Sequence, residues 1–133
     1  AVAVANGENT VYLAHNRDLR VSNDGGTQWQ TVAQTLPGLA STLTVNPTNP
    51  NILFAGMHSQ GMWLSTDGGK TWQSLTRNFS NEAIGESTVT ASTVDPANPL
   101  RVVMAHGIRI GGLGSEFYPL GILMSNDGGK SWG

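Results

Sequence analysis

The stretch Ser65-Thr66-Asp67-Gly68-Gly69-Lys70-Thr71-Trp72 occurs in three closely similar copies along the chain, which align without gaps. The other two copies are Ser22-Asn23-Asp24-Gly25-Gly26-Thr27-Gln28-Trp29 and Ser125-Asn126-Asp127-Gly128-Gly129-Lys130-Ser131-Trp132. Three copies in a chain of 133 residues indicate an internal repeat, which decides the fold before any other feature does. The first copy differs at Gln28, where the others carry Thr71 and Ser131.

Each copy has the composition of a tight turn between two β-strands. Asp-Gly-Gly suits a hairpin because glycine adopts positive φ at little steric cost. The Asp carboxylate and the Ser and Thr hydroxyls can form hydrogen bonds within the same turn, and the closing Trp ring can pack between neighbouring sheets. We therefore predict structural rather than catalytic roles for Ser22, Asp24, Gly26, Trp29, Ser65, Asp67, Gly69, Trp72, Ser125, Asp127, Gly129 and Trp132.

Short β-rich runs surround each copy, and the second repeat shows them most clearly. Its four candidate strands are Thr42–Val45, Ile52–Gly56, Gly61–Ser65 and Thr71–Leu75. Units of about 40–45 residues with four strands each are typical of propeller blades. The predicted fold is all-β, a β-propeller of four-stranded antiparallel blades with about three blades present. Residues 1–133 are predicted to form a single partial β-propeller, with blades at approximately 1–36, 37–80 and 81–133.

A closed propeller typically has about four to eight blades. We therefore expect the remaining blades to come from the same polypeptide or from further copies of the chain.

The composition narrows the possible functions. Charged residues make up 12% of the chain and the net charge is −2, with seven basic residues scattered singly. Nucleic-acid binding requires clustered Lys and Arg, so we expect no nucleic-acid partner. The chain has no cysteine, and no apolar run approaches the roughly 20 residues of a membrane span. We expect no cofactor and no metal, and because the chain begins at Ala1 rather than Met, an extracytoplasmic or secreted location.

The spacing of the repeats shows two insertions. We call each copy a box, after its opening serine and central aspartate. The opening serines of the first two boxes, Ser22 and Ser65, are 43 residues apart, whereas Ser65 and Ser125 are 60 apart. The connection after the second copy is six residues longer than the one after the first, and the connection between the second and third strands of the last blade is twelve residues longer, while the stretch from the Asp95 corner to His106 is one residue shorter. In an up-and-down sheet both connections lie at the end opposite the Asp-Gly-Gly hairpins. Long loops on a rigid scaffold often carry binding, so we predict the functional face there.

The candidate ligand-binding residues lie at that end. The longer insertion, Gly107 to Gly121, is predicted to be a loop in which an exposed Phe-Tyr pair beside a carboxylate suits a sugar ring or a protein partner. The other, around Arg77 to Glu86, also contains Glu82. The three histidines are predicted to end equivalent strands, where they could contact a ligand or simply pack locally. The predicted ligand-binding residues are His15, His58, His106, Arg109, Glu116, Phe117 and Tyr118.

With the three boxes and the corner Val45-Asn46-Pro47-Thr48-Asn49-Pro50, the chain resembles the Asp-box (BNR) repeat β-propeller superfamily over nearly its whole length. The corner and the run Gly61 to Ser65 look most like the photosystem II assembly-factor and xyloglucanase branches. Sortilin-type receptors of the superfamily usually contain cysteines, and this chain has none. Sialidases use an Arg-Ile-Pro motif, from which Arg109-Ile110-Gly111 departs.

The resemblance implies two functions. The first is a non-catalytic propeller scaffold that binds a protein or a glycan through its long connections. The alternative is a glycoside hydrolase of the xyloglucanase type, which needs two carboxylates flanking the scissile bond. The sequence does not identify its catalytic residues. The carboxylates expected at the end opposite the Asp-Gly-Gly hairpins are Asp18, Glu82, Glu86 and Glu116.

Overall fold

A computed structural model describes residues 1–4, 9–33, 36–76, 86–111, 114 and 116–133. The described residues form antiparallel strands joined by turns, without helices. The strands are β1 (Val2–Val4), β2 (Val11–His15), β3 (Asp18–Ser22), β4 (Gln30–Ala33), β5 (Ala40–Asn46), β6 (Asn49–Met57), β7 (Gly61–Ser65), β8 (Gln73–Ser74), β9 (Thr88–Asp95), β10 (Asn98–Ile110) and β11 (Glu116–Ser125).

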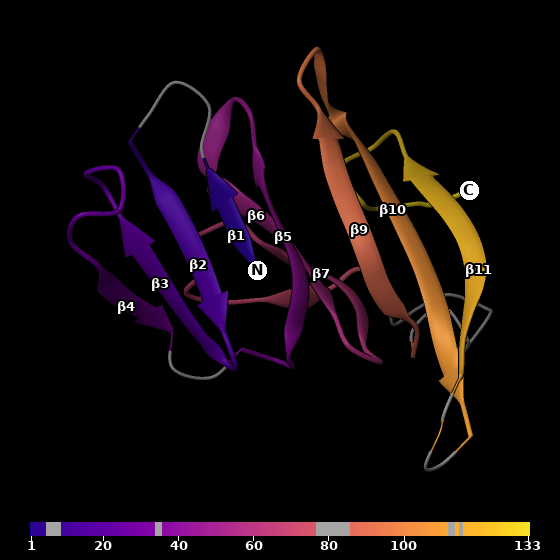
Figure 1. The fold of residues 1–133 in the computed structure, drawn as a ribbon. Helices are drawn as coiled ribbons and strands as arrows, with labels where there is room; N and C mark the ends of the chain where they lie inside the picture. The colour runs from indigo at the N-terminus through magenta and orange to yellow at the C-terminus, as the bar shows by residue number, and fades with distance from the viewer. Residues whose placement is uncertain (5–8, 34–35, 77–85, 112–113, 115) are drawn as a thin grey trace.

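The strands make three sheets that follow one another along the chain (Figure 1). The first has the order β1-β2-β3-β4, the second β5-β6-β7-β8 and the third β9-β10-β11. Each consecutive pair is antiparallel, as in the up-and-down blades of a propeller. The predicted all-β partial propeller with about three blades is therefore confirmed.

The third sheet contains three strands, together with the first contact of a fourth. The backbone of Gly133 exchanges two hydrogen bonds with Met124, at 2.9 and 3.0 Å. Gln73 pairs with Leu64 at the corresponding place in the second sheet. Gly133 thus occupies the place that Gln73, the first residue of β8, has in the second sheet.

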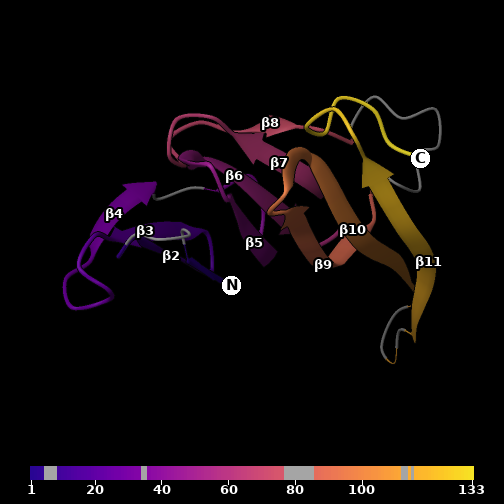
Figure 2. The same cartoon turned by 90° about the horizontal axis from the view of Figure 1, so that it is seen from above.

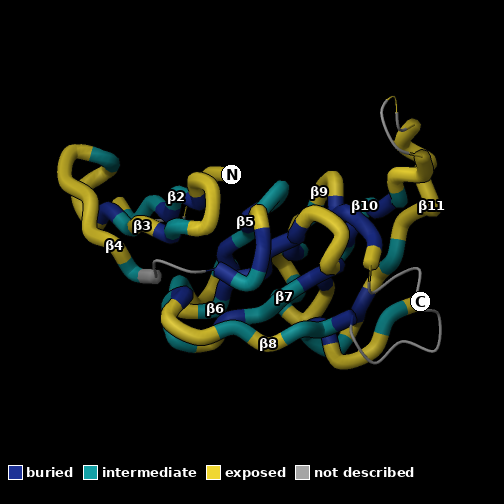
Figure 3. The backbone as a smooth tube through the Cα atoms, turned by 90° about the horizontal axis from the view of Figure 1, so that it is seen from below, coloured by how far each residue is buried: buried dark blue, intermediate teal, exposed yellow. Residues whose placement is uncertain are grey.

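Two hydrophobic clusters hold the three sheets together. One joins the first and second sheets through buried side chains such as Tyr12, Leu19 and Leu53. The other joins the second and third sheets through side chains such as Phe54 and Met104. The strands alternate their side chains between two faces, so β2 turns Tyr12 and Ala14 towards the second sheet. Seen from above, the three sheets lie side by side in chain order, from β4 at one side to β11 at the other (Figure 2). Figure 3 shows that buried residues gather in the middle and that exposed residues follow β4 and β11.

Candidate functional site

The Asp-box hairpins lie at one end of every sheet and are closed by their own side chains. In the second box Ser65 Oγ donates to Asp67 Oδ1 and accepts from the backbone N–H of Gly69, each at 2.8 Å. Asp67 accepts from the backbone N–H of Thr71 at 2.9 Å and from the Thr71 hydroxyl at 2.5 Å. Trp72 Nε1 donates to the carbonyl oxygen of Gly69 at 2.9 Å. The polar groups of the box are therefore engaged within the turn.

These hydrogen bonds favour the ionised carboxylates. The hydroxyl and backbone N–H of Thr71, followed by Ser65, lower the pKa of Asp67 to about 2. In the third box the same contacts from Ser131 and Ser125 lower the pKa of Asp127. In the first box the pKa of Asp24 is lowered chiefly by the backbone N–H of Gln28, whose side chain replaces the hydroxyl. A carboxylate held ionised by its own turn is poorly suited to be a catalytic acid.

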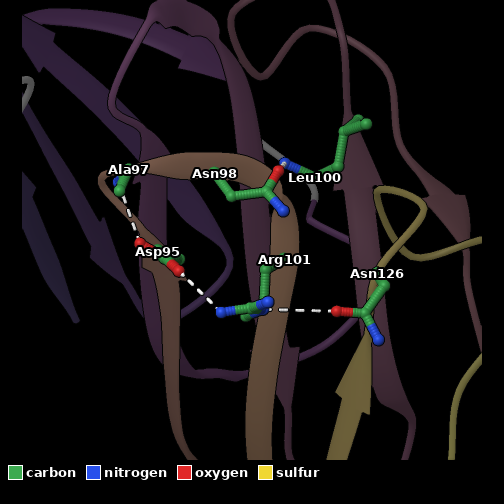
Figure 4. Close-up of polar contacts among 6 residues, drawn as sticks. All are labelled: Asp95, Ala97, Asn98, Leu100, Arg101 and Asn126. Atoms are coloured by element: carbon green, nitrogen blue, oxygen red, sulfur yellow. Dashed lines mark hydrogen bonds and ion pairs between the residues drawn. The ribbon is translucent and has the colours of Figure 1, made fainter.

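A second polar cluster fastens the third box to the neighbouring corner (Figure 4). Arg101 forms an ion pair with Asp95 at 3.1 Å and donates from Nε to Asn126 Oδ1 at 3.3 Å. The Asp95 side chain also accepts from the backbone N–H of Ala97 at 2.8 Å. The side chains of Arg101 and Asp95 are 46% and 27% exposed, and a solvent-accessible ion pair contributes about 0–1 kcal/mol, so the cluster orients the corner more than it stabilises the blade.

The opposite end of the third sheet is an extended hairpin rather than the predicted loop. β10 continues to Ile110 and β11 begins at Glu116, so most of the stretch Gly107 to Gly121 is strand. The corner between β9 and β10 lies at the top of Figure 1, and the other ends of β10 and β11 extend past the sheets at the bottom. We call residues 107–110 and 116–120 the ribbon. β-branched and aromatic side chains explain the strand conformation, which the abundant glycines of this stretch obscured.

The register divides the ribbon side chains between two faces. Ile110 lies opposite Glu116 and Ile108 opposite Tyr118, so these four share one face. Tyr118 Oη donates to Glu116 Oε2 at 2.9 Å, and Tyr118 and Ile110 are 45% and 56% exposed. This face therefore presents an aromatic ring, a carboxylate and aliphatic groups to solvent.

The other face of the ribbon carries Phe117 opposite Arg109. A Cβ at Gly107 would overlap the Phe117 ring, so the ring lies directly on this glycine. Phe117 and Tyr118 are thus on opposite faces and cannot bind one sugar ring together. The sequence predicted them as a pair, and the strand pairing separates them.

The three predicted histidines are not equivalent. Counted along the strand from the residue opposite the box serine, His15, Met57 and His106 occupy the same position. His58 lies one residue further, because the turn after Met57 has three residues where the turn after His15 has two. His15 and His58 are exposed, whereas His106 is 5% exposed. Equal sequence distance to the box serine concealed this difference in turn length.

His106 Nδ1 has no hydrogen-bond partner among the described residues. Burial lowers the pKa of His106 below its ordinary value of 6.5. The unfolded chain therefore takes up this proton first as the pH falls, and the folded state loses stability below about pH 6.5. We expect the urea midpoint to fall between about pH 7.5 and about pH 5.5, and to fall much less in His106→Leu. His15→Leu is the control and should keep the full decrease; an equal decrease in all three proteins would contradict the prediction.

The remaining site predictions lie partly outside the described residues. Arg77 and Glu82, in the shorter insertion, belong to this part, whereas Glu86 is described and exposed. Across the residues that the structure describes, no group of three His, Asp or Glu side chains is placed to hold a metal ion, and no helix is long and apolar enough to cross a membrane.

The three sheets follow one another along the chain, and each carries one Asp-box at the same end. This arrangement defines a β-propeller of Asp-box repeats. The family model Sortilin-Vps10, described as "Sortilin, neurotensin receptor 3", matches residues 17–133. The chain therefore belongs to this family. The absence of cysteine did not separate it from the sortilin-type members as expected, because the matched region contains all three boxes and no disulfide.

Solved structures show the same architecture. A GH74 enzyme from Niastella koreensis aligns with 100% of the chain at TM-score 0.71 and 24% identity. The GH74 xyloglucanase from Xanthomonas campestris aligns with 100% at TM-score 0.73 and 18% identity. The chain spans 22% of the length of each of these two proteins, and at such identities they show the fold alone. YCF48 bound to D1 peptide aligns over 98% of the chain and 65% of its own, at TM-score 0.45 and 16% identity. No curated protein matches the chain.

Proposed function

We propose that the chain is a non-catalytic propeller scaffold that binds a glycan through the ribbon face formed by Tyr118, Glu116 and Ile110. The hydrogen bond between Tyr118 Oη and Glu116 Oε2 carries this proposal. It fixes the ring on an exposed strand and uses the single hydroxyl proton, so the tyrosine oxygen and the second carboxylate oxygen are left as acceptors. The face therefore suits a ligand that is rich in O–H donors.

The aliphatic part of the same face supports a sugar rather than an ion. The exposed Tyr118 ring and Ile110 provide an apolar surface, and a sugar ring combines an apolar C–H face with hydroxyls at its rim. Amphipathic aromatic side chains are well suited to such mixed surfaces. Arg109 lies on the opposite face, so no cation of the ribbon accompanies the ligand there, which favours a neutral glycan.

An extended peptide fits the ribbon less well. Peptides often add a strand to an open sheet edge, but Pro119 lacks a backbone N–H on β11 and the register shifts next to it, between His106 and Gly107. Proline and bulges are devices that prevent edge pairing. Of the two predicted ligand classes, protein and glycan, the ribbon therefore favours a glycan.

The proposal is tested by titrating the chain with xyloglucan oligosaccharides and other neutral oligosaccharides in a calorimeter. Tyr118→Ala is expected to weaken the binding about tenfold, or about 1.4 kcal/mol, because both ring and hydroxyl are lost. Leu100→Ala is the control: it removes another exposed apolar side chain, 58% exposed, beside the third box, and this variant should bind normally. Unchanged affinity in Tyr118→Ala, or no binding of any neutral glycan, would reject the site.

The hydrolase alternative has a separate readout in the same samples. A glycosidase needs carboxyl groups about 5–9.5 Å apart. Of the candidate carboxylates, Asp18 forms an ion pair with Arg20, with 3.9 Å between Asp18 Oδ2 and the guanidinium nitrogen. Glu116 accepts the hydrogen bond from the Tyr118 hydroxyl. Release of reducing ends that disappears in Glu116→Gln would replace the non-catalytic proposal by the enzymatic one. The extracytoplasmic location stays a prediction of the sequence.

A further inference from the structure

The three Asp-boxes differ in how they hold the second oxygen of the aspartate carboxylate. In the third box the Ser131 hydroxyl donates to Asp127 Oδ2 at 2.5 Å, and the second box has the same hydroxyl contact. In the first box Gln28 stands at this position and donates from its backbone N–H to Asp24 Oδ1, at 2.9 Å. Asp24 Oδ2 has no hydrogen-bond partner among the described residues.

Each box aspartate precedes a glycine, which opens a route to rearrangement of the backbone. The glycine nitrogen attacks Cγ of the aspartate side chain once that carboxyl group has taken up a proton from solvent. The carboxyl hydroxyl leaves as water together with the amide proton, and a succinimide ring closes. Water then opens the ring at either carbonyl carbon and gives aspartate or isoaspartate, without a change in mass. Glycine favours ring closure because it carries no side chain beside the attacking nitrogen.

The hydroxyl contact opposes ring closure in two ways. A donor to a carboxylate favours its ionised form, and the Ser131 hydroxyl is the main cause of the lowered pKa of Asp127. The same hydroxyl fixes Oδ2 while backbone N–H groups fix Oδ1. Cγ therefore turns towards the glycine nitrogen only when a charge-assisted hydrogen bond to Oδ2 is also broken. The first box lacks this protection.

The backbones of the first and third boxes are otherwise closely matched. Both boxes contain the sequence Asn-Asp-Gly-Gly, at residues 23–26 and 126–129. The attacking nitrogens, those of Gly25 and Gly128, each donate to a backbone carbonyl oxygen at 2.8 Å, and both glycines have φ of 73°. The two boxes thus present the same attacking group in the same conformation, and the contact at Oδ2 distinguishes them.

We infer that Asp24 is a site of spontaneous isomerisation to isoaspartate in the folded chain, whereas Asp67 and Asp127 are protected. Isoaspartate carries the former side-chain carbon in its backbone, which lengthens the turn and displaces the acceptor of the Thr27 and Gln28 N–H groups. The modification should therefore loosen the hairpin between β3 and β4. This hairpin lies at the end opposite the ribbon, so the inference is independent of the glycan site.

The inference is tested by ageing the chain at neutral pH and physiological temperature. Samples are then denatured and digested with an endoproteinase that cleaves before aspartate but not before isoaspartate, and missed cleavages are measured by mass spectrometry. Isoaspartate is expected to accumulate at Asp24 about tenfold faster than at Asp127, the effect of one charge-assisted hydrogen bond. In urea the two sites should age at similar rates, because the boxes are unfolded. No isoaspartate at Asp24, equal rates in the folded chain, or the same preference in urea would overturn the inference.

Exchanging the residue that faces Oδ2 tests the cause. Gln28→Thr should slow the reaction at Asp24 to the rate of Asp127, because it supplies the hydroxyl that Thr71 supplies in the second box. Ser131→Gln is the matched reverse change and should raise the rate at Asp127 about tenfold while leaving Asp24 unchanged. Circular dichroism confirms that each variant is folded. An unchanged rate at Asp24 in folded Gln28→Thr would show that the hydroxyl gives no protection and would overturn the inference.

Discussion

Gly69→Ala is expected to lower the free energy of unfolding by about 2–5 kcal/mol. Gly69 has φ of +92°, where an L-residue is strained by about 1–2 kcal/mol. In addition, its new Cβ would overlap the Leu19 side chain, which is 0% exposed and would have to shift within the first hydrophobic cluster. Overpacking a well-filled site costs about 1–3 kcal/mol more. The two costs have different origins and should add.

Gly26→Ala separates the two contributions. Gly26 has φ of +99°, but a Cβ there would meet only Trp29 Cζ2 at 3.6 Å, an ordinary contact. This variant should lose only the strain, about 1–2 kcal/mol. Urea unfolding of both variants at equal m-value gives the comparison. Equal losses would mean that the glycines serve their own turns alone and that Leu19 does not pack into the second box.

The contrast between these glycines shows that an Asp-box is more than a turn. Ser65, Asp67 and Thr71 fix the turn from within, and the glycine and tryptophan then present a flat surface to the preceding sheet. In the third box a Cβ on Gly129 would lie 2.5 Å from the side chain of Leu75, the residue after β8. A repeat of local hydrogen bonds therefore also sets the spacing between sheets, which links the motif to the propeller.

The fold could be predicted because its decisive signals are local. Positive φ at Gly68 and Gly69 and the hydrogen bonds of Asp67 all arise within one box. When local preferences agree with the global fold, the fold can be predicted from the sequence. The third sheet illustrates this: its corner at Asp95 and its box at Asp127 are where the repeat predicts them.

The candidate site depended on pairing between distant residues and was only partly predictable. The sequence named Tyr118 and Glu116, but which face each occupies follows from the register against Ile108 and Ile110. Those two isoleucines were missed, although their alternation with Arg109 is the period of a strand. The His58 position likewise depended on a turn one residue longer, with Ser59 at φ of 55°, which no count along the chain reveals.

Trp72→Ala is the second large effect we expect, a loss of about 3 kcal/mol. This lies at the lower end of the range for buried aromatic truncations, because Trp72 is half-buried against the first cluster. Trp29→Ala provides the control within the same chain, since both rings donate to their box glycine at 2.9 Å. Trp29 has no preceding sheet to pack on among the described residues. Its removal should therefore cost about 1 kcal/mol, the value of one hydrogen bond.

The difference between the two tryptophans measures the contact between sheets directly. Leu19→Ala should reduce the effect of Trp72→Ala, because Trp72 packs against the cluster that contains Leu19 and residues packed together couple by about 0.5–3 kcal/mol. It should leave the effect of Trp29→Ala unchanged. If the two tryptophan variants are equally destabilised, the ring acts only within its own hairpin. The sheets would then be held by the strand side chains alone, and the Asp-box would determine the turn but not the propeller.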